Sequence, residues 1–330
     1  MRRLIQFCKK FFGLSLIAIA ALWLFGPREP IDASVIFEAT SLNDDLDEYL
    51  AQSEARFGDL TEGIQKRIIW AGANGAKTDL ALVYLHGWGA SSEEIRPVPD
   101  DVAARFGANL YFTRLKGHGR PSNLMAMSEP TMNDWVQDIA EAIAIGQRIG
   151  ERVVLLTTST GGTLAVVAAN DPALRDWITG IVFVSPNFGP IEPMAALANW
   201  PLARYWLPIL VGEWREWEPH NALQGKYWTT RSQIVAGLPM MALIKYTNGI
   251  NLSDLDVPAL FIYSEQDAVV SPALTAAAID TWGGPKQVEK RIMTSEDSPN
   301  HHVIAGDIMS PNQTVETVQI ISDWISGLLN

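Results

Sequence analysis

The stretch that most constrains the fold is VVLLTTSTGGTL, residues 153–164. Its first half is apolar and β-branched, which indicates a buried strand. Ser159 follows at the end of this strand, and Gly161 and Gly162 come shortly after it. Small and apolar residues continue as far as residue 169, which indicates a helix. The sequence therefore predicts a strand, a sharp turn with a serine at its apex, and a helix that passes close to the strand.

Predicted strands and helices alternate on both sides of this unit. Apolar runs predict strands at residues 63–70, 80–85, 109–113, 181–184, 259–263 and 288–293, and helical spacing predicts helices at residues 42–57, 131–149, 272–280 and 314–328. Such alternation gives a parallel sheet with helices on both faces. We therefore expect an α/β fold with a mostly parallel central sheet.

The alternation stops between residues 186 and 254. This segment is rich in Pro, Trp and Met, and five of the twelve tryptophans of the chain lie in it: Trp200, Trp206, Trp214, Trp217 and Trp228. We interpret it as a helical cap inserted into the core, with an apolar underside that suits an acyl chain. The expected organisation is an N-terminal segment over residues 1–30, a core over 31–185 and 255–330, and the cap over 186–254.

Composition excludes several classes of function. The formal net charge is −12 and no long basic run occurs beyond the first ten residues, which argues against a nucleic-acid partner. The only cysteine is Cys8, so an intrachain disulfide is impossible and no Cys/His metal cluster can form. We expect neither a metal nor a cofactor.

The N-terminus predicts a membrane segment. Two arginines and two lysines within the first ten residues precede fifteen uncharged residues, 11–25. As a helix this run would extend about 22 Å, against about 30 Å for a hydrocarbon core, so that it could span with local thinning. We expect an uncleaved signal anchor with the rest of the chain outside the cytoplasm, which is the periplasm if the source is a bacterium. A cleaved signal peptide with secretion, or a packed helix of a cytosolic protein, are the alternatives.

A serine needs partners to act as a nucleophile, because its hydroxyl is unreactive at neutral pH. A base must take its proton, and an acid must hold the tautomer of that base. Asp267 stands just beyond a predicted strand, and His302 stands before the closing helix. Asp256 lies at the opposite end of that strand, which favours Asp267. His301 and Glu265 are the alternatives to His302 and Asp267.

Five short motifs occur along the chain near the ends of predicted strands. They are HGWG at 86–89, KGHG at 116–119, TTSTGG at 157–162, QDAVV at 266–270 and HV at 302–303. Together they resemble the α/β-hydrolase superfamily, most closely its monoacylglycerol lipase, carboxylesterase and lysophospholipase group, over residues 63–330. The family pattern at the nucleophile is G-x-S-x-G, and Thr157 replaces its first glycine here. In this family the histidines at positions such as His86 and His118 are structural.

The resemblance implies a serine hydrolase with Ser159 as nucleophile, His302 as general base and acid, and Asp267 as the residue that orients His302. The backbone N–H groups of Trp88 and Thr160 would form the oxyanion hole. The expected reaction is hydrolysis of a carboxylic ester, lipid-like or otherwise acyl, through an acyl enzyme and without a cofactor. Acyl transfer or thioester hydrolysis by the same residues is an alternative, as is a catalytically inactive binding module.

Overall fold

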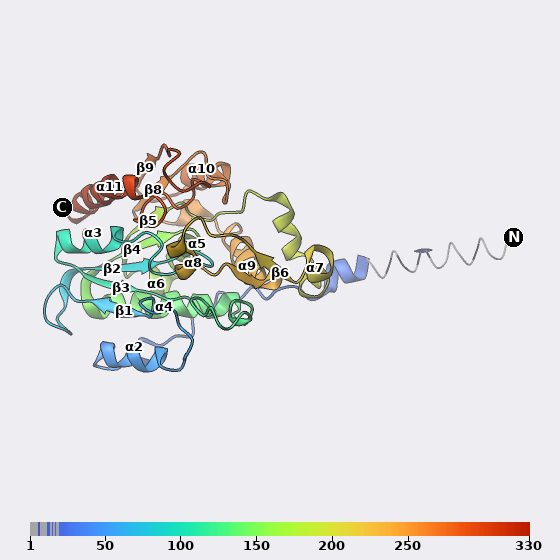
Figure 1. Ribbon diagram of the computed structural model, residues 1–330, viewed down its shortest axis with the longest axis horizontal. Helices are drawn as coiled ribbons and strands as arrows, with labels where there is room; N and C mark the ends of the chain where they lie inside the picture. The colour runs from blue at the N-terminus through green and yellow to red at the C-terminus, as the bar shows by residue number, and fades with distance from the viewer. Residues whose placement is uncertain (1–5, 7–11, 14, 16, 18–19) are drawn as a thin grey trace.

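The computed structural model describes residues 6, 12–13, 15, 17 and 20–330, and its centre is a seven-stranded sheet (Figure 1). The strands, in their spatial order, are β1 (Arg67–Ile69), β3 (Asn109–Phe112), β2 (Thr78–Leu85), β4 (Gly150–Thr158), β5 (Ile178–Val184), β8 (Ala259–Tyr263) and β9 (Lys286–Lys290). β1 is antiparallel to β3, and every other neighbouring pair is parallel. The predicted α/β fold with a mostly parallel sheet is confirmed.

Helices cover both faces of this sheet. α4 (Met132–Ile149), α5 (Thr160–Asn170) and α10 (Pro272–Thr281) pack on one face, and α3 (Val98–Phe106) and α11 (Pro311–Leu329) pack on the other. The other helical elements of the core are η1 (Ala39–Ser41), α2 (Leu46–Glu54), η2 (Ala126–Ser128), α6 (Pro172–Arg175) and η5 (Leu252–Asp254). The crossover helices bury the sheet from both sides, as parallel strands require.

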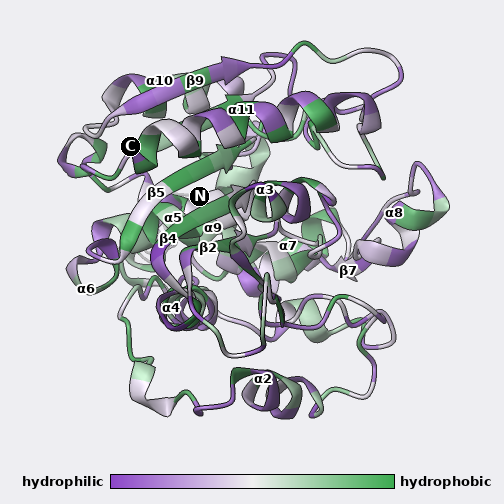
Figure 2. Cartoon of the chain, turned by 90° about the vertical axis from the view of Figure 1, so that its left-hand side faces the viewer, coloured by the Kyte–Doolittle hydropathy of each residue, from purple (hydrophilic) through white to green (hydrophobic). Residues whose placement is uncertain are grey.

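The alternation of side chains along β2 explains why there are two apolar cores. Ala81, Val83 and Leu85 pack with α4 and α5, whereas Leu80, Leu82 and Tyr84 pack with α3 and α11. Successive side chains of a strand point to opposite faces, so a strand that is covered on both faces must be apolar throughout. Figure 2 shows the same result as hydrophobic central strands inside helices with hydrophilic outer faces.

Two predicted elements differ from the structure in instructive ways. α2 begins after Asp45, whose side chain accepts a hydrogen bond from the Glu48 N–H, and it is shorter than the predicted helix over 42–57. β9 lies two to three residues before the predicted strand over 288–293. It is an edge strand whose residues are mostly exposed, so no buried apolar run marks its position.

Residues 186–254 connect β5 to β8 and are more regular than the sequence indicates. They contain η3 (Pro193–Asn199), α7 (Ala203–Val211), β6 (Trp214–Glu216), α8 (Ala222–Tyr227), β7 (Arg231–Gln233), η4 (Ile234–Gly237) and α9 (Leu238–Thr247). β6 and β7 form an antiparallel hairpin. η3, α7 and α9 share a small apolar core, and α9 also packs against α5 of the main domain.

The predicted membrane anchor is wrong. Within the part of the chain that the structure describes, no helix combines the length and the apolar character needed to cross a membrane. Of the predicted apolar run, residues 11, 14, 16, 18 and 19 lie outside the described residues, and residues 20–25 are helical. We therefore withdraw the membrane location that we predicted from this segment.

The end of this segment instead packs against residues 200–204. The Trp23 and Trp200 rings meet edge to face with centroids 4.8 Å apart. The Leu202 N–H donates to the Pro27 carbonyl at 2.7 Å, and the Arg204 guanidinium pairs with the Glu29 carboxylate at 2.7 Å. Residues 23–29 therefore lie beside α7, as Figure 1 shows.

Candidate active site

Ser159 sits at the tight turn between β4 and α5. Its backbone has φ 52° and ψ −115°, a conformation that costs free energy for any residue with a side chain. The turn is tight because α5 starts directly against β2: a Cβ on Gly161 would lie only 2.3 Å from the Leu85 carbonyl oxygen. The sequence therefore folds into the predicted strand, turn and helix with the serine at the apex.

Thr157, which departs from the family pattern, is accommodated without an unsatisfied polar group. Its side chain is fully buried, and its hydroxyl donates to the Val182 carbonyl of the neighbouring strand at 2.9 Å. The small Gly162 lies opposite, where a Cβ would be 3.4 Å from the Thr157 hydroxyl oxygen. A threonine fits here because its hydroxyl finds a backbone acceptor inside the sheet.

Asp267 and His302 lie in direct contact. His302 Nδ1 is 2.7 Å from Asp267 Oδ2. The other carboxylate oxygen, Oδ1, accepts the backbone N–H groups of Val269 at 2.8 Å and Val270 at 3.0 Å. Because a carboxylate only accepts, Nδ1 of the histidine carries the proton and Nε2 is left as the basic nitrogen.

His302 and Ser159 line one cavity of about 790 Å³. No direct hydrogen bond joins these two described residues. Burial by itself lowers the pKa of His302, but the charge of Asp267, its hydrogen bond and the charge of Glu94 together raise that pKa above the usual histidine value. The imidazole is thus a stronger base than a free histidine and faces the same space as the serine.

The other histidines take different places. His86 is buried, with Nε2 accepting the Leu115 N–H at 3.1 Å, and burial lowers its pKa to about 4. His118 packs against it with ring centroids 5.0 Å apart, and burial lowers its pKa as well. His220 lines the exposed part of the cavity, whereas His301 has φ 51° and does not line it. Of the two adjacent histidines, His302 is therefore the one that contacts the carboxylate.

Two backbone N–H groups border the serine. Thr160 is the first residue of α5, where N–H groups lack partners within the helix. Trp88 follows Gly87, and a Cβ on that glycine would lie 3.1 Å from Ser159 Cβ. Among the described residues, no hydrogen-bond acceptor contacts the N–H of Trp88 or of Thr160. Two free donors beside the serine can receive a developing negative charge.

Residues 186–254 touch the loop that carries Trp88. The Thr229 N–H donates to the Gly89 carbonyl at 2.7 Å. The guanidinium of Arg215 lies over the Trp88 ring, 5.3 Å from its centroid. This segment therefore helps to fix the loop beside the serine.

Residues 186–254 supply much of the cavity lining, in which their apolar side chains outnumber polar ones such as Glu192, Arg215 and Glu218. The apolar lining residues from the connecting segment include Leu207, Val211, Ile234, Leu238, Met240 and Met241. Of the five tryptophans in this segment, Trp217 and Trp228 line the cavity. Trp200 and Trp206 pack against each other, with ring centroids 6.4 Å apart.

Sequence reasoning missed Glu94, which also lines this cavity. It is buried in the loop between β2 and α3, and its carboxylate accepts the Gly87 N–H at 2.7 Å. Burial raises its pKa to about 7, although the Gly87 N–H, the charge of His302 and the Tyr84 hydroxyl act in the opposite direction. The only signal in the sequence is its place shortly after the HGWG motif.

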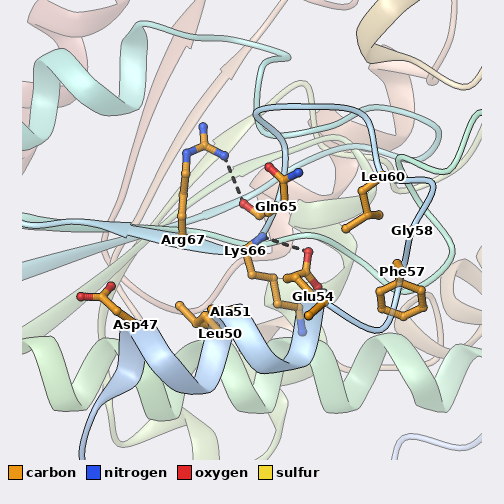
Figure 3. Close-up of a pocket in the computed structure, with 11 residues that line it drawn as sticks. Asp47, Leu50, Ala51, Glu54, Phe57, Gly58, Leu60, Gln65, Lys66 and Arg67 are labelled. Carbon is orange, nitrogen blue, oxygen red and sulfur yellow. Dashed lines mark hydrogen bonds between the residues drawn. The ribbon is translucent and has the colours of Figure 1, made fainter.

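A second cavity, of about 470 Å³, lies between α2 and β1 and is shown in Figure 3. Two of its charged groups form ion pairs: Glu54 pairs with Arg114 at 2.7 Å, and Lys66 pairs with Glu141. The backbone N–H of Lys66 also donates to Glu54 at 3.1 Å. Within the described residues, no group of His, Cys, Asp and Glu side chains is arranged to hold a metal ion.

Solved structures with a similar fold are numerous. A structure reported for LipS and LipT, two metagenome-derived lipolytic enzymes, has a TM-score of 0.62 at 17% identity and covers 81% of this chain and 99% of its own. Monoacylglycerol lipase of Paleococcus ferrophilus has 0.58 at 17% identity, with 80% and 98% covered. A soluble variant of monoglyceride lipase from Saccharomyces cerevisiae has 0.58 at 13%, with 80% and 91% covered. At these identities the similarity concerns the fold.

No curated protein sequence matches the chain. The family model described as the alpha/beta hydrolase family, however, matches residues 82–303, about two thirds of the chain. The match spans the loop with Trp88, the turn with Ser159 and the histidine that contacts Asp267. Together with the sheet order and the tight turn after β4, it identifies this protein as a member of the alpha/beta hydrolase family.

Proposed function

We propose that this protein is a serine hydrolase of carboxylic esters, with Ser159 as nucleophile, His302 as general base and acid, and Asp267 as the residue that orients His302. The observation that carries the proposal is the buried Asp267–His302 pair, 2.7 Å apart, on the cavity that also contains the strained Ser159. Serine catalysis needs a nucleophile, a base and an acid that orients the base, and Ser159, His302 and Asp267 would supply one each.

The reaction proceeds in two halves. His302 Nε2 takes the proton of the Ser159 hydroxyl as its oxygen attacks the ester carbonyl, and the N–H groups of Trp88 and Thr160 bind the resulting oxyanion. The intermediate collapses, and the alcohol leaves with the proton from His302. Water then gives its proton to His302 and attacks the acyl group on Ser159. The second intermediate releases the carboxylic acid, and the proton returns to the serine.

The substrate class follows from the cavity. A volume of about 790 Å³ with apolar walls on the side of residues 186–254 suits the acyl chain of a lipid-like ester. We propose that these residues form the cap of the active site, since many of the lining side chains belong to them. Lipolytic activity is what the name of LipS and LipT describes, and this chain has a similar fold.

Labelling with a fluorophosphonate probe tests the nucleophile. We expect the purified protein to be labelled, Ser159→Ala to lose labelling and His302→Ala to lose most of it. Ser253→Ala, which changes an exposed serine of η5, is the matched control and should label like the parent. Hydrolysis of p-nitrophenyl esters of increasing chain length then measures the acyl preference. A folded parent that neither reacts with the probe nor hydrolyses any ester would point to a catalytically inactive binding module.

A further inference from the structure

Glu94 is a buried carboxyl group in the active-site cavity that the mechanism above does not use. Its side chain is 2% exposed. The hydrogen bonds of its carboxylate fall on one oxygen, Oε2, which accepts the Gly87 N–H at 2.7 Å and the Tyr84 hydroxyl at 3.3 Å. The neighbouring Glu93 behaves differently, because its carboxylate pairs with Arg67 and Arg96 away from the cavity. A buried carboxyl group without a cationic partner is costly, which calls for a functional reason.

The second oxygen of this carboxyl group lies beside the nucleophile. A Cβ placed on Gly87 would be 2.8 Å from Glu94 Oε1 and 3.1 Å from Ser159 Cβ. Oε1 and the serine therefore border the same small space, and that space exists because residue 87 has no side chain. Glu94, Ser159 and His302 line the same cavity, so the carboxyl group belongs to the same site as both proposed catalytic side chains.

Gly87 precedes the Trp88 N–H and is held by hydrogen bonds at its carbonyl, which belongs to the same peptide group as that N–H, and at its own N–H. The Gly87 carbonyl accepts His86 Nδ1 at 2.9 Å and the Ala90 N–H at 3.2 Å. The Gly87 N–H is held by Glu94 Oε2. A glycine has more backbone freedom than any other residue, so these hydrogen bonds determine the direction of the following N–H.

We propose that Glu94 is a positioning residue of the active site: one carboxyl oxygen fixes Gly87 so that the Trp88 N–H points at the oxyanion, and the charge of the group acts on His302. This inference rests on the proposed function. It adds a fourth side chain to the catalytic arrangement, one that never bonds to substrate in the steps above.

The effect of the Glu94 charge on His302 can be separated from the effect of its hydrogen bond to Gly87. The titratable groups that face Glu94 are Tyr84 from β2 and His302 from the loop before α11, and Asp267 lies behind the histidine. The negative charge of Glu94 contributes to the raised pKa of His302. Because burial raises the pKa of Glu94 itself to about 7, this charge acts on His302 mainly above that pH. An uncharged residue at position 94 would lower the pKa of His302 there, so the loss of activity on acidification would begin at a lower pH.

Ester hydrolysis by the full chain, measured from pH 5 to 9, tests the inference with three variants. Glu94→Ala removes the acceptor, and we expect kcat to fall roughly 10- to 100-fold with little change in KM, since one misplaced oxyanion donor has such an effect. Glu94→Gln keeps an oxygen for the Gly87 N–H, so kcat at pH 8 should remain close to that of the parent while the low-pH limb shifts to lower pH. Glu93→Gln is the matched control and should change neither kcat nor the position of the low-pH limb.

The outcomes separate this inference from the proposed function. An active parent with unchanged kcat in Glu94→Ala would overturn the positioning role and leave the serine hydrolase intact. Equal losses in the Ala and Gln variants, with equally lowered melting temperatures and an unshifted pH profile, would show a purely structural residue and also overturn it. A folded parent without any hydrolysis would overturn the proposed function and this inference together.

Discussion

Replacing Asp267 with Asn tests the proposed acid and base most sharply, because it preserves shape and changes only which atoms donate. In the parent, Oδ1 of Asp267 accepts two backbone N–H groups at 2.8 and 3.0 Å, and Oδ2 contacts His302 Nδ1 at 2.7 Å. An asparagine has one oxygen and one NH₂ group to divide between these partners. Facing the NH₂ toward the two backbone N–H groups would leave both unsatisfied, at a cost of about 1–3 kcal/mol each.

The asparagine oxygen must therefore stay with the backbone, and its NH₂ group must face His302. Nδ1 of the imidazole then has to accept, so the proton moves to Nε2 and the nitrogen that faces the cavity cannot take the Ser159 proton. In one well-studied Ser-His-Asp triad, an Asp→Asn change that produces this wrong tautomer lowers kcat by roughly 10⁴. The corresponding loss of transition-state stabilisation is about 5 kcal/mol. We expect an effect of this size on ester hydrolysis and on the rate of fluorophosphonate labelling.

The matched control is Glu265→Gln, which neutralises an exposed carboxylate two residues earlier that pairs with Lys290. It should leave kcat unchanged. Thermal unfolding of the two variants checks that each is folded. If Asp267→Asn folds normally and keeps kcat within about tenfold of the parent, the tautomer argument is refuted.

Three further predictions follow from the same geometry. Gly87→Ala should lower kcat by roughly tenfold or more, because its Cβ would lie 2.8 Å from a Glu94 carboxyl oxygen and displace the loop. Thr157→Gly should lower the free energy of unfolding in urea by about 1–2 kcal/mol while kcat is retained, because the hydroxyl bond to Val182 is lost and the chain gains freedom. The kcat/KM of the parent should fall as pH decreases, with an apparent pKa above the ordinary histidine value, because the pKa of His302 is raised and its protonated form cannot act as a base.

Each of these has a clear contrary result. A Gly87→Ala variant with parental kcat and KM would show that the loop tolerates a side chain. A Thr157→Gly variant that is more stable than the parent would show that the buried hydroxyl contributes nothing. A kcat/KM that stays constant from pH 8 to pH 5 would exclude a histidine base with a raised pKa.

Local patterns in the sequence predicted most of the fold. β8 was expected at residues 259–263 and lies there, because central parallel strands are buried on both faces and read as continuous apolar runs. β9 was misplaced, since an exposed edge strand carries no such signal. The membrane anchor failed for a related reason: an apolar run alone does not distinguish a membrane span from a segment whose end packs on the protein, as Trp23 does on Trp200.

By itself the sequence determined the elements and the turn that presents Ser159, because both depend on residues close together in the chain. It left open which histidine meets the carboxylate, and it gave no reason to single out Glu94. Tertiary structure decided both, since contacts between residues 35 positions apart, such as Asp267 and His302, depend on how the strands are ordered in the sheet. The same packing buries Glu94 beside Ser159. A glutamate is common in any sequence, and it is this buried position that makes Glu94 a candidate for function.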